Sequence, residues 1–412
     1  MTGRFRARPP PPLRYRRPMS APPFGRSYLS HWLLDPEITY LNHGTVGVTP
    51  RRVLDVQQRL RDEMERQPAR FILRELSGES GRHDLPQTRL RAATERVAEF
   101  LGAAAGDLVF VQNATTGVNA VLRSFDFRPG DEILVPNLAY GAVARTAQFV
   151  ARERGAVVRP VDLPFPPPDP AACVEAYVCA TGPRARLAIV DHISSETALL
   201  LPVREIAAAL RAQGVAVLVD AAHAPGAIPV DIPSQGVDWY VANLHKWAFA
   251  PRGCGILWAA PERQEGLRPP VISWGFEQGF PLEFDWSPTS DPTSYLSAPE
   301  GIDFLRDLGT EAVQTYDHDL VWQAGHRLAE RWGTELPTPE AMIGTMISVP
   351  LPASLGSTRA EAGLLRDALL FEDRLEAGPF AHGGRLWIRI AAQVYNDMAD
   401  FDRLGAAIDA RR

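Results

Sequence analysis

The chain has 412 residues, of which 45% are hydrophobic and 22% are charged, and its formal net charge is −6. A chain of this length and composition can bury a large core, and we expect a globular protein with two lobes. The excess of acidic residues argues against a nucleic-acid-binding protein, because such proteins carry a basic bias or a basic patch.

The three cysteines, Cys173, Cys179 and Cys254, lack the spacing of a metal site, so no metal is expected. Without a disulfide framework they indicate a reducing compartment, and we expect the protein in the cytoplasm. No apolar run approaches the roughly 20 residues that a membrane-spanning helix needs, so no membrane partner is expected.

The N-terminal segment, residues 1–29, differs from the rest of the chain. Residues 1–25 hold six arginines, a run of four prolines and no acidic residue. They lack the apolar stretch of a secretion signal. We predict a disordered arm or an arm that clasps a partner subunit.

Regular patterns begin at residue 38. A short strand at 38–40 leads into a glycine-containing turn, and apolar spacing predicts helices over 53–64 and 89–101. Strands then alternate with helices, and the strands are continuously apolar, which is typical of a parallel sheet wrapped by helices. The predicted strands are 109–111, 132–135, 157–161, 187–190, 215–219 and 237–241.

The pattern changes near residue 299. Two helical segments, 299–308 and 312–332, precede shorter strand-like pieces at 346–349 and 385–390. We therefore predict a large domain over 30–298 and a smaller α+β domain over 299–412, with the N-terminal segment of the large domain contributing to the small lobe.

Lys246 is the only lysine in the chain; the count of 43 lysines and arginines leaves 42 arginines. Arginine stays protonated, whereas a desolvated lysine can lose its proton and condense with a carbonyl group. By the count alone, a leftover surface lysine explains the residue equally well. Its neighbours in the predicted sheet decide between these interpretations.

Polar residues follow several predicted strands, where ligands bind in open parallel sheets. Ala114 and Thr115 open a helix, whose N-terminus suits a phosphate, although helix capping is the commoner role. Asp220 ends a strand and can face a ring nitrogen, or it caps the next turn. Tyr140 can lie flat on an aromatic ligand. Together with Lys246 they describe a site for pyridoxal 5′-phosphate.

Two motifs in this region resemble the class V aminotransferase family, within the isopenicillin N epimerase-like branch. They are Asp-Ala-Ala-His-Ala-Pro-Gly at 220–226 and Asn-Leu-His-Lys-Trp at 243–247. Further matches lie at 40–44, 113–119 and 389–396, and the resemblance extends from about residue 30 to the C-terminus. It implies an α/β fold, the fold type I of pyridoxal-phosphate-dependent enzymes. That fold has a large domain with a mostly parallel seven-stranded sheet and a smaller α+β C-terminal domain.

The resemblance also implies the catalytic roles. Lys246 would hold the cofactor covalently and move the Cα proton of the substrate. Asp220 would pair with the ring nitrogen, His223 and Ser195 would lie near the phenolic oxygen, and Tyr140 would stack on the ring.

Phosphate and substrate contacts are implied in the same way. The phosphate would be held by Ala114, Thr115, Asn243 and His245, and Thr289 would reach the cofactor of a partner subunit in a homodimer with shared sites. Arg389 would bind the carboxylate of an amino-acid substrate with its guanidinium fork. The remaining substrate pocket is expected to consist of Asn42, His43, Phe71, Trp274, Phe276 and Tyr295.

Two positions depart from the family pattern. Ser290 stands where relatives often have an arginine, and Glu196 stands where the epimerase branch usually has proline. With serine at position 290, the chain has no arginine there to form the contact between subunits that the family pattern implies. For Glu196, a solvated loop carboxylate is favoured over a group that faces the substrate.

Several reactions remain open at this stage. We favour β-elimination from a cysteine S-conjugate in specialised metabolism, because Lys246 alone can remove the Cα proton and assist the leaving group. Epimerisation needs a second acid, for which Tyr140 and His43 are the candidates. Decarboxylation-linked oxidation, and a cofactor-binding protein without turnover, are further alternatives. Cysteine desulfuration is rejected, since residues 353–384 of the C-terminal lobe contain no cysteine.

Overall fold

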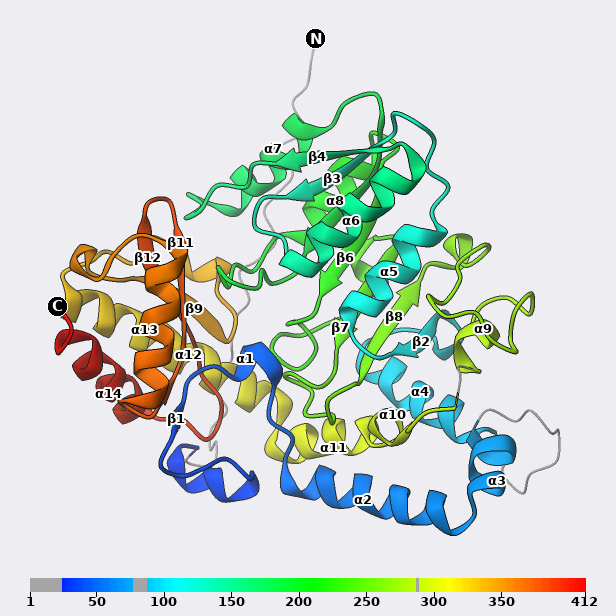
Figure 1. Ribbon diagram of the computed structural model, residues 1–412, viewed down its shortest axis with the longest axis horizontal. Helices are drawn as coiled ribbons and strands as arrows, with labels where there is room; N and C mark the ends of the chain where they lie inside the picture. The colour runs from blue at the N-terminus through cyan, green and yellow to red at the C-terminus, as the bar shows by residue number, and fades with distance from the viewer. Residues whose placement is uncertain (1–23, 77–86, 287–288) are drawn as a thin grey trace.

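The computed structural model describes residues 24–76, 87–286 and 289–412 (Figure 1). Most of the predicted N-terminal arm, up to residue 23, lies outside the described residues. Within the described part of the chain, no helix is long and apolar enough to cross a membrane.

A seven-stranded sheet forms the centre of the larger lobe, with the strand order β2-β8-β7-β6-β5-β3-β4. All neighbouring strands are parallel except where β8 pairs with β7 and with β2. This confirms the predicted mostly parallel seven-stranded sheet. The strands are β2 (Leu108–Val111), β3 (Glu132–Pro136), β4 (Val157–Val161), β5 (Ala185–Asp191), β6 (Ala216–Ala221), β7 (Trp239–Asn243) and β8 (Gly255–Ala259).

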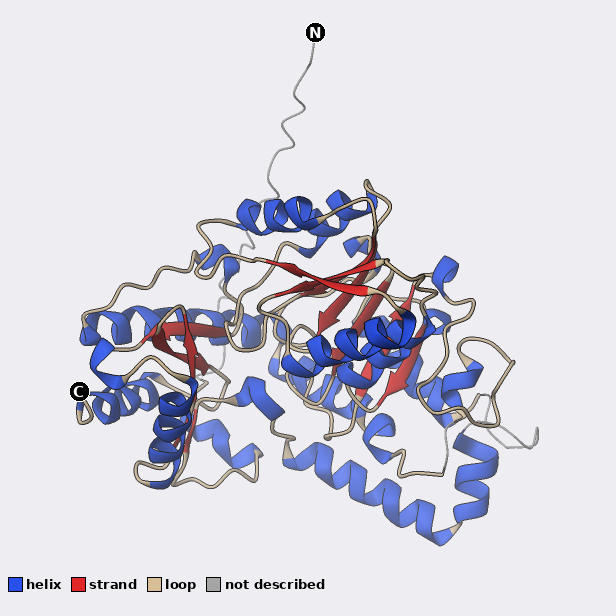
Figure 2. Cartoon of the chain, turned by 45° about the horizontal axis from the view of Figure 1, so that its top comes forward, coloured by secondary structure: helices blue, strands red, loops and turns tan. Residues whose placement is uncertain are grey.

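Helices cover both faces of this sheet (Figure 2). On one face, α5 (Ala114–Ser124) and α6 (Gly141–Arg154) pack against the side chains of Ile189, Leu218 and Val241. On the other face, α4 (Arg89–Phe100), α7 (Pro170–Ala180) and α8 (Val203–Arg211) pack against Val190 and Val219. Burial from both sides explains why these strands are apolar at successive positions.

The smaller lobe contains an antiparallel sheet of three strands in the order β11-β12-β9. Its strands are β9 (Met346–Pro350), β11 (Gly378–His382) and β12 (Arg385–Ala391), and its helices are α12 (Thr310–Trp332), α13 (Arg359–Phe371) and α14 (Met398–Asp409). A parallel pair of β1 (Thr39–Tyr40) and β10 (Leu375–Glu376) attaches the N-terminal segment to this lobe. The domain boundaries at residues 30 and 299 stay a prediction.

Further helices surround the larger lobe (Figure 1). They are α1 (His43–Val46), α2 (Arg51–Arg66), α3 (Pro68–Arg70), α9 (Leu282–Asp285), α10 (Thr293–Leu296) and α11 (Ala298–Leu308). In Figure 1, α2, α10 and α11 run along the lower side of the larger lobe, and α3 and α9 lie on the side away from the smaller lobe. Gly333, at φ 66°, ends α12 in the left-handed conformation that glycine adopts without steric cost.

Candidate active site

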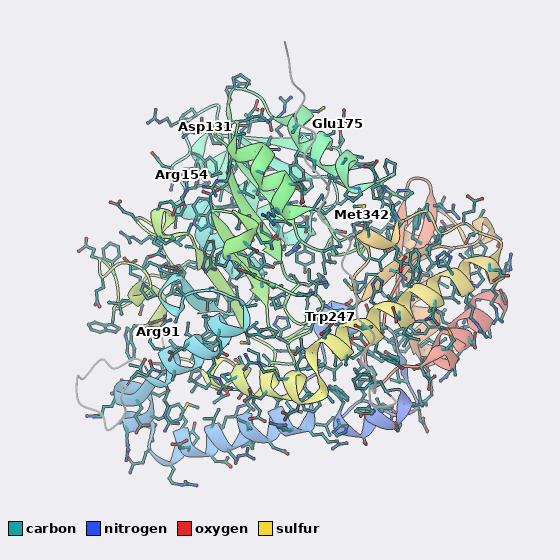
Figure 3. All side chains as sticks on the ribbon, turned by 180° about the vertical axis from the view of Figure 1, so that it is seen from behind. Arg91, Asp131, Arg154, Glu175, Trp247 and Met342 are labelled. Carbon is teal, nitrogen blue, oxygen red and sulfur yellow. The ribbon has the colours of Figure 1, made fainter. Side chains whose placement is uncertain are left out.

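A cavity of about 330 Å³ lies at the carboxyl ends of the parallel strands, between the two lobes. It is lined by Thr45, Val46, Asn113, Ala114, Thr115, Tyr140, Asp191, Ile193, Ser195, Asp220, Ala222, His223, Asn243, His245, Lys246 and Arg389. Figure 3 labels Trp247, the neighbour of Lys246, close to α12. Ten of the residues predicted for the cofactor and the substrate carboxylate therefore meet in one place.

Lys246 lies in the loop that follows β7, and only 8% of its surface is exposed. Its Nζ lies 3.1 Å from His223 Nε2. Burial first, and the positive charge of Arg389 second, lower the pKa of the amine to about 7, against the opposing effect of Asp220. The same burial holds the pKa of His223 well below its ordinary value, so His223 is neutral and accepts from the lysine. Lys246 is therefore an amine that can lose its proton near neutral pH.

Two glycines fix the backbone of the lysine loop. Gly47 has φ 65°, and a Cβ on it would lie 1.9 Å from the carbonyl oxygen of His245. Gly226 has φ 92°, and its Cβ would lie 2.3 Å from the carbonyl oxygen of Trp247. Only glycine allows this approach of one backbone to another. Gly47, which follows α1, and Gly226, which ends the motif at 220–226, thus both allow a close contact with the backbone of the lysine loop.

His43 holds the same loop from behind and does not line the cavity. Its Nε2 lies 2.9 Å from the carbonyl oxygen of Lys246, and its Nδ1 lies 2.8 Å from the hydroxyl of Tyr395. A carbonyl only accepts, so Nε2 donates and Nδ1 accepts from the tyrosine. Complete burial lowers the pKa of the ring to about 4. In this chain His43 supports the lysine loop, and its place in the substrate pocket, as a possible second acid, stays a prediction.

Two carboxyl groups lie on the floor of the cavity. The carboxylate of Asp220 accepts the backbone N–H of Ala222 at 3.0 Å. Burial raises its pKa, while that hydrogen bond and Lys246 lower it. Asp191, at the end of the neighbouring strand β5, is the second group, and burial beside Asp220 raises its pKa well above the ordinary value. The sequence reasoning assigned no role to Asp191, although it ends a strand just as Asp220 does.

The N-terminus of α5 forms the phosphate end of the cavity. Asn243 accepts the N–H of Ala114 at 2.9 Å, and Asn113 caps the helix by accepting the N–H of Thr116 at 2.9 Å. Asn243 therefore fixes the position of the helix end, and Thr115 lines the cavity beside it. An eleven-residue helix directs partial positive charge toward an anion at this point.

His245 lies near the same end with its ring oriented by a backbone carbonyl. Nδ1 lies 3.0 Å from the carbonyl oxygen of Cys254 and must donate to it. Burial lowers the pKa of the ring to about 4, so Nε2 carries no proton when the site is empty of anions. His245 donates to a phosphate only after its ring is protonated, which the negative charge of that phosphate favours.

Arg389 reaches the cavity from β12 and is bound by neutral acceptors alone. Its guanidinium donates to the carbonyl oxygen of Ser195, to Thr45 Oγ1 and, at 2.7 Å, to Asn42 Oδ1. No ion pair of Arg389 with a carboxylate is found among the described residues, and burial lowers its pKa to about 10. This buried positive charge remains available for an anionic ligand.

Asn42 does not line the cavity and acts through Arg389. Its Nδ2 donates to Glu376 Oε1 at 2.8 Å, which turns its Oδ1 toward the guanidinium. This side chain orients the arginine, and its contact with the substrate stays a prediction.

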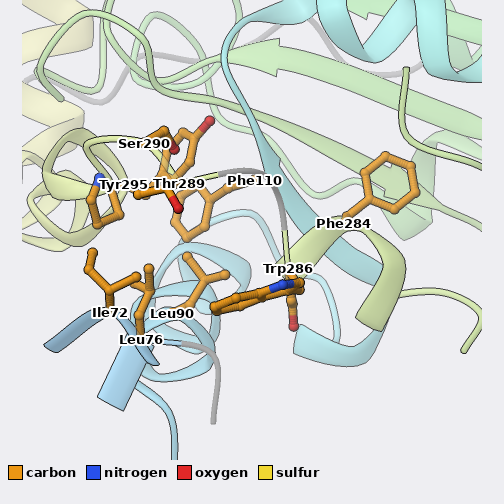
Figure 4. Close-up of a pocket in the computed structure, with 11 residues that line it drawn as sticks. Ile72, Leu76, Leu90, Phe110, Phe284, Trp286, Thr289, Ser290 and Tyr295 are labelled. Atoms are coloured by element: carbon orange, nitrogen blue, oxygen red, sulfur yellow. The ribbon is translucent and has the colours of Figure 1, made fainter. Parts of the chain in front are cut away.

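Four aromatic residues and Thr289 lie outside this cavity in their own chain. Phe71 is buried beneath Arg89, whose guanidinium carbon lies 4.5 Å from the ring centroid. Trp274 and Phe276 are exposed, by 79% and 50%. Tyr295 and Thr289 line a separate cavity of about 30 Å³ (Figure 4). None of these residues lines the cavity within its own chain, and the aromatic substrate pocket stays a prediction.

The donor set of the cavity fits pyridoxal phosphate. Asp220 offers a carboxylate for a ring nitrogen, Lys246 an amine for an aldehyde, and the helix end an anion site. The Nδ1 atom of His223 is buried and has no partner within the described residues, as expected of a group that faces a ligand oxygen. Tyr140, 49% exposed at the start of α6, is placed to cover an aromatic ring.

Comparisons with known proteins agree with this geometry. The family model "Aminotransferase class-V" matches residues 40–363. Isopenicillin N epimerase from Streptomyces clavuligerus is 34% identical, over 92% of this chain and 96% of the relative. Putative L-cysteine desulfhydrase 1 from Oryza sativa subsp. japonica is 32% identical, over 90% of this chain and 83% of the relative.

Solved structures show the same fold. The cystine C-S lyase C-DES, in complex with its reaction product cysteine persulfide, matches with a TM-score of 0.73 and 23% identity. The match covers 90% of this chain and 97% of the other. A variant of C-DES has glycine covalently linked to its PLP cofactor, and it matches with a TM-score of 0.73 and 22% identity over 91% of this chain and 97% of the other.

Proposed function

The chain belongs to the class V aminotransferase family, and from this premise we propose that it cleaves the C–S bond of a cysteine-type amino acid. It is a pyridoxal-phosphate-dependent enzyme. Its relatives named as cysteine desulfhydrases support the choice of bond. The observation that carries the proposal is the buried amine of Lys246, beside Arg389, whose hydrogen bonds within the described residues go to neutral acceptors.

We assign each step to a residue of this cavity. Arg389 binds the substrate carboxylate and so fixes Cα above Lys246. The cofactor, when bound, withdraws electrons from Cα. The neutral Nζ of Lys246 takes the Cα proton and then delivers it to the departing sulfur. Asp220 holds the ring nitrogen, and His223 accepts a hydrogen bond from the lysine in the free site.

The proposed reaction balances without an oxidant. The Cα–H and C–S bonds break, and the proton leaves with the sulfur as a thiol. The remaining enamine takes up water and becomes pyruvate and ammonium. A single base that moves one proton is sufficient for this sequence.

The cysteines of this chain support elimination rather than persulfide transfer to the protein. Cys173 and Cys254 are buried, and Cys179 is exposed on α7. None of the three lines the cavity, so no thiol of this chain is placed to accept sulfur. We propose that the sulfur leaves as a free thiol.

Epimerisation is the second candidate, favoured by one observation. Tyr140 lines the cavity with a hydroxyl-bearing ring and is half exposed. It is the candidate for a second acid, which epimerisation needs and elimination does not. The relative named isopenicillin N epimerase supports this alternative.

One assay separates the two reactions. Purified holoenzyme is given cysteine, cystine and a set of S-substituted cysteines in deuterated water. Pyruvate and Cα deuteration are then followed by proton NMR, and ammonium is measured by a separate colorimetric assay, because its protons exchange with the deuterated solvent. We expect pyruvate and ammonium in equal amounts, retained in Tyr140→Phe. Cα exchange with inversion and no pyruvate, lost in Tyr140→Phe, would establish the epimerase instead.

We also propose a homodimer in the cytoplasm. An exposed apolar patch of Val271, Ile272, Trp274, Phe276 and Leu282 supports the dimer, because exposed side chains of this kind gather at interfaces. Thr289 would then reach the partner's cofactor. Sedimentation of the wild type and of Trp274→Glu tests this, with a dimer expected for the first and a monomer for the second.

The three unpaired cysteines support the proposed location in the cytoplasm, where thiols stay reduced.

A further inference from the structure

Asp191 and Asp220 form a side-by-side pair on the sheet. The register between β5 and β6 places Asp191 opposite Asp220, and side chains of opposed residues in a parallel ladder leave the same face. Neighbouring strands lie about 4.8 Å apart. Each residue is 3% exposed, and both line the cavity.

The two carboxyl groups have unequal partners. Asp220 accepts the N–H of Ala222 and lies within the field of Lys246. The Oδ2 atom of Asp191 is buried, and no hydrogen-bond partner for it is found among the residues that the structure describes. The next side chain, His192, points to the opposite face and bonds the hydroxyl of Tyr240 at 2.8 Å.

The charges around Asp191 are few. Besides Asp220, the titratable or charged groups that share its cavity or interact with it are Tyr140, His223, His245, Lys246, Arg389 and Tyr177. The histidines are neutral, and Lys246 loses its charge near neutral pH. Arg389 interacts with Glu196 and Glu376. Two ionised carboxylates side by side in this setting would repel each other without sufficient compensation.

We propose that Asp191 is a positioning residue: it carries the proton of a two-carboxyl pair, and the negative charge of the pair rests on Asp220. Asp191 is the protonated member because its Oδ2 has no partner among the described residues, and because the amine of Lys246 stabilises the charge on Asp220 and not that on Asp191. The N–H of Asp191 itself favours the charged form, but burial and the neighbouring Asp220 outweigh it. The two groups titrate as one unit.

The proton on Asp191 has a consequence for Lys246, which rests on the proposed function. A second negative charge beside Asp220 would stabilise the protonated amine and raise its pKa. A neutral Asp191 therefore preserves an amine that can accept the Cα proton near pH 7.

Infrared spectroscopy tests the protonation without turnover. The full-length protein at neutral pH should show the C=O stretch of protonated buried carboxyls, and Asp191→Asn should lose one component of that band. Asp317 is the matched control: it is 1% exposed, its Oδ1 has no partner within the described residues, and burial raises its pKa well above the ordinary value. Asp317→Asn should lose a different component of the band.

The activity of the same variants, measured as a function of pH, provides the second test. Asp191→Asn, which mimics a neutral acid, should keep activity at pH 7 within about threefold of wild type and leave the acid limb of the pH profile, which Lys246 sets, where it is in wild type. Asp220→Asn should lose about thirtyfold or more, as expected when a charge-assisted hydrogen bond is removed. Asp317→Asn should keep the wild-type profile.

Either of two results would overturn the proposal. One is an unchanged carboxyl band in Asp191→Asn, which means that Asp191 is ionised. The other is a loss at pH 7 as large as that of Asp220→Asn. If Asp191→Asn does not fold, Asp191→Ser provides the same two measurements, the infrared carboxyl band and the activity at pH 7. If the band changes as expected while no C–S lyase activity exists, the carboxyl pair stands and the proposed function fails.

Discussion

The amine of Lys246 provides the most quantitative prediction. With a pKa of about 7, half of the amine is unprotonated at pH 7. A solvated lysine has a pKa of about 10.4, so roughly one amine in three thousand would be free at the same pH. Capture of the cofactor aldehyde by the apo-protein needs the free amine. Its rate should therefore fall about tenfold for each pH unit below 7 and level off above it.

Replacing Arg389 tests the cause of this shift. The positive charge of Arg389 lowers the pKa of Lys246, second only to burial. In Arg389→Gln the acid limb of the capture rate should move to higher pH, because the protonated amine no longer meets a neighbouring cation. Arg327→Gln is the control, since Arg327 forms an ion pair with Asp402 at the surface of the small lobe.

Cofactor uptake is followed by the absorbance of the bound cofactor in stopped flow, from about pH 5 to about pH 10. The titration of the free cofactor is common to all variants and cancels in their comparison. A wild-type limb near the pKa of a solvated lysine would refute the burial argument. The same limb in wild type and Arg389→Gln would refute the electrostatic one.

Two further changes test the supports of the site. Gly47→Ala should lose cofactor affinity by at least about tenfold, because its Cβ would lie 1.9 Å from the carbonyl oxygen of His245. Gly266→Ala, at φ 78° with nothing within 4 Å, carries the same backbone strain and should bind normally; equal losses in both would contradict the account. Asn42→Asp should raise KM about tenfold with a smaller change in kcat, since a carboxylate would neutralise Arg389. Steady-state kinetics decide this, and an unchanged KM would count against the role of the arginine.

The sequence predicted the fold because its strands are apolar on both sides and end in polar residues. It predicted β5, β6 and β7 and the helices on either side of β2. It did not predict α7, whose residues 170–180 follow a proline-rich stretch without a helical pattern. It also did not predict β8, an antiparallel strand whose position depends on pairing with β2 and β7.

Local motifs located the cavity but not the residues behind it. Lys246, Asp220 and Arg389 meet as expected, although they come from distant parts of the chain. A histidine at position 43 suggests an acid–base catalyst. Only its hydrogen bond to the carbonyl oxygen of Lys246 shows that it holds the lysine loop in place. Aromatic side chains gave no reliable signal, since such residues pack at many places in a core. Asp191 became significant only through the register between β5 and β6.

The attachment of the cofactor to Lys246 is the central claim, and one measurement tests it most directly. The purified holoenzyme is reduced with borohydride, digested with trypsin and analysed by mass spectrometry. Because Lys246 is the only lysine, trypsin should release residues 212–252 as one peptide that carries the mass of the reduced cofactor. Unmodified peptides that end at Lys246, with the cofactor lost or bound elsewhere, would contradict the account.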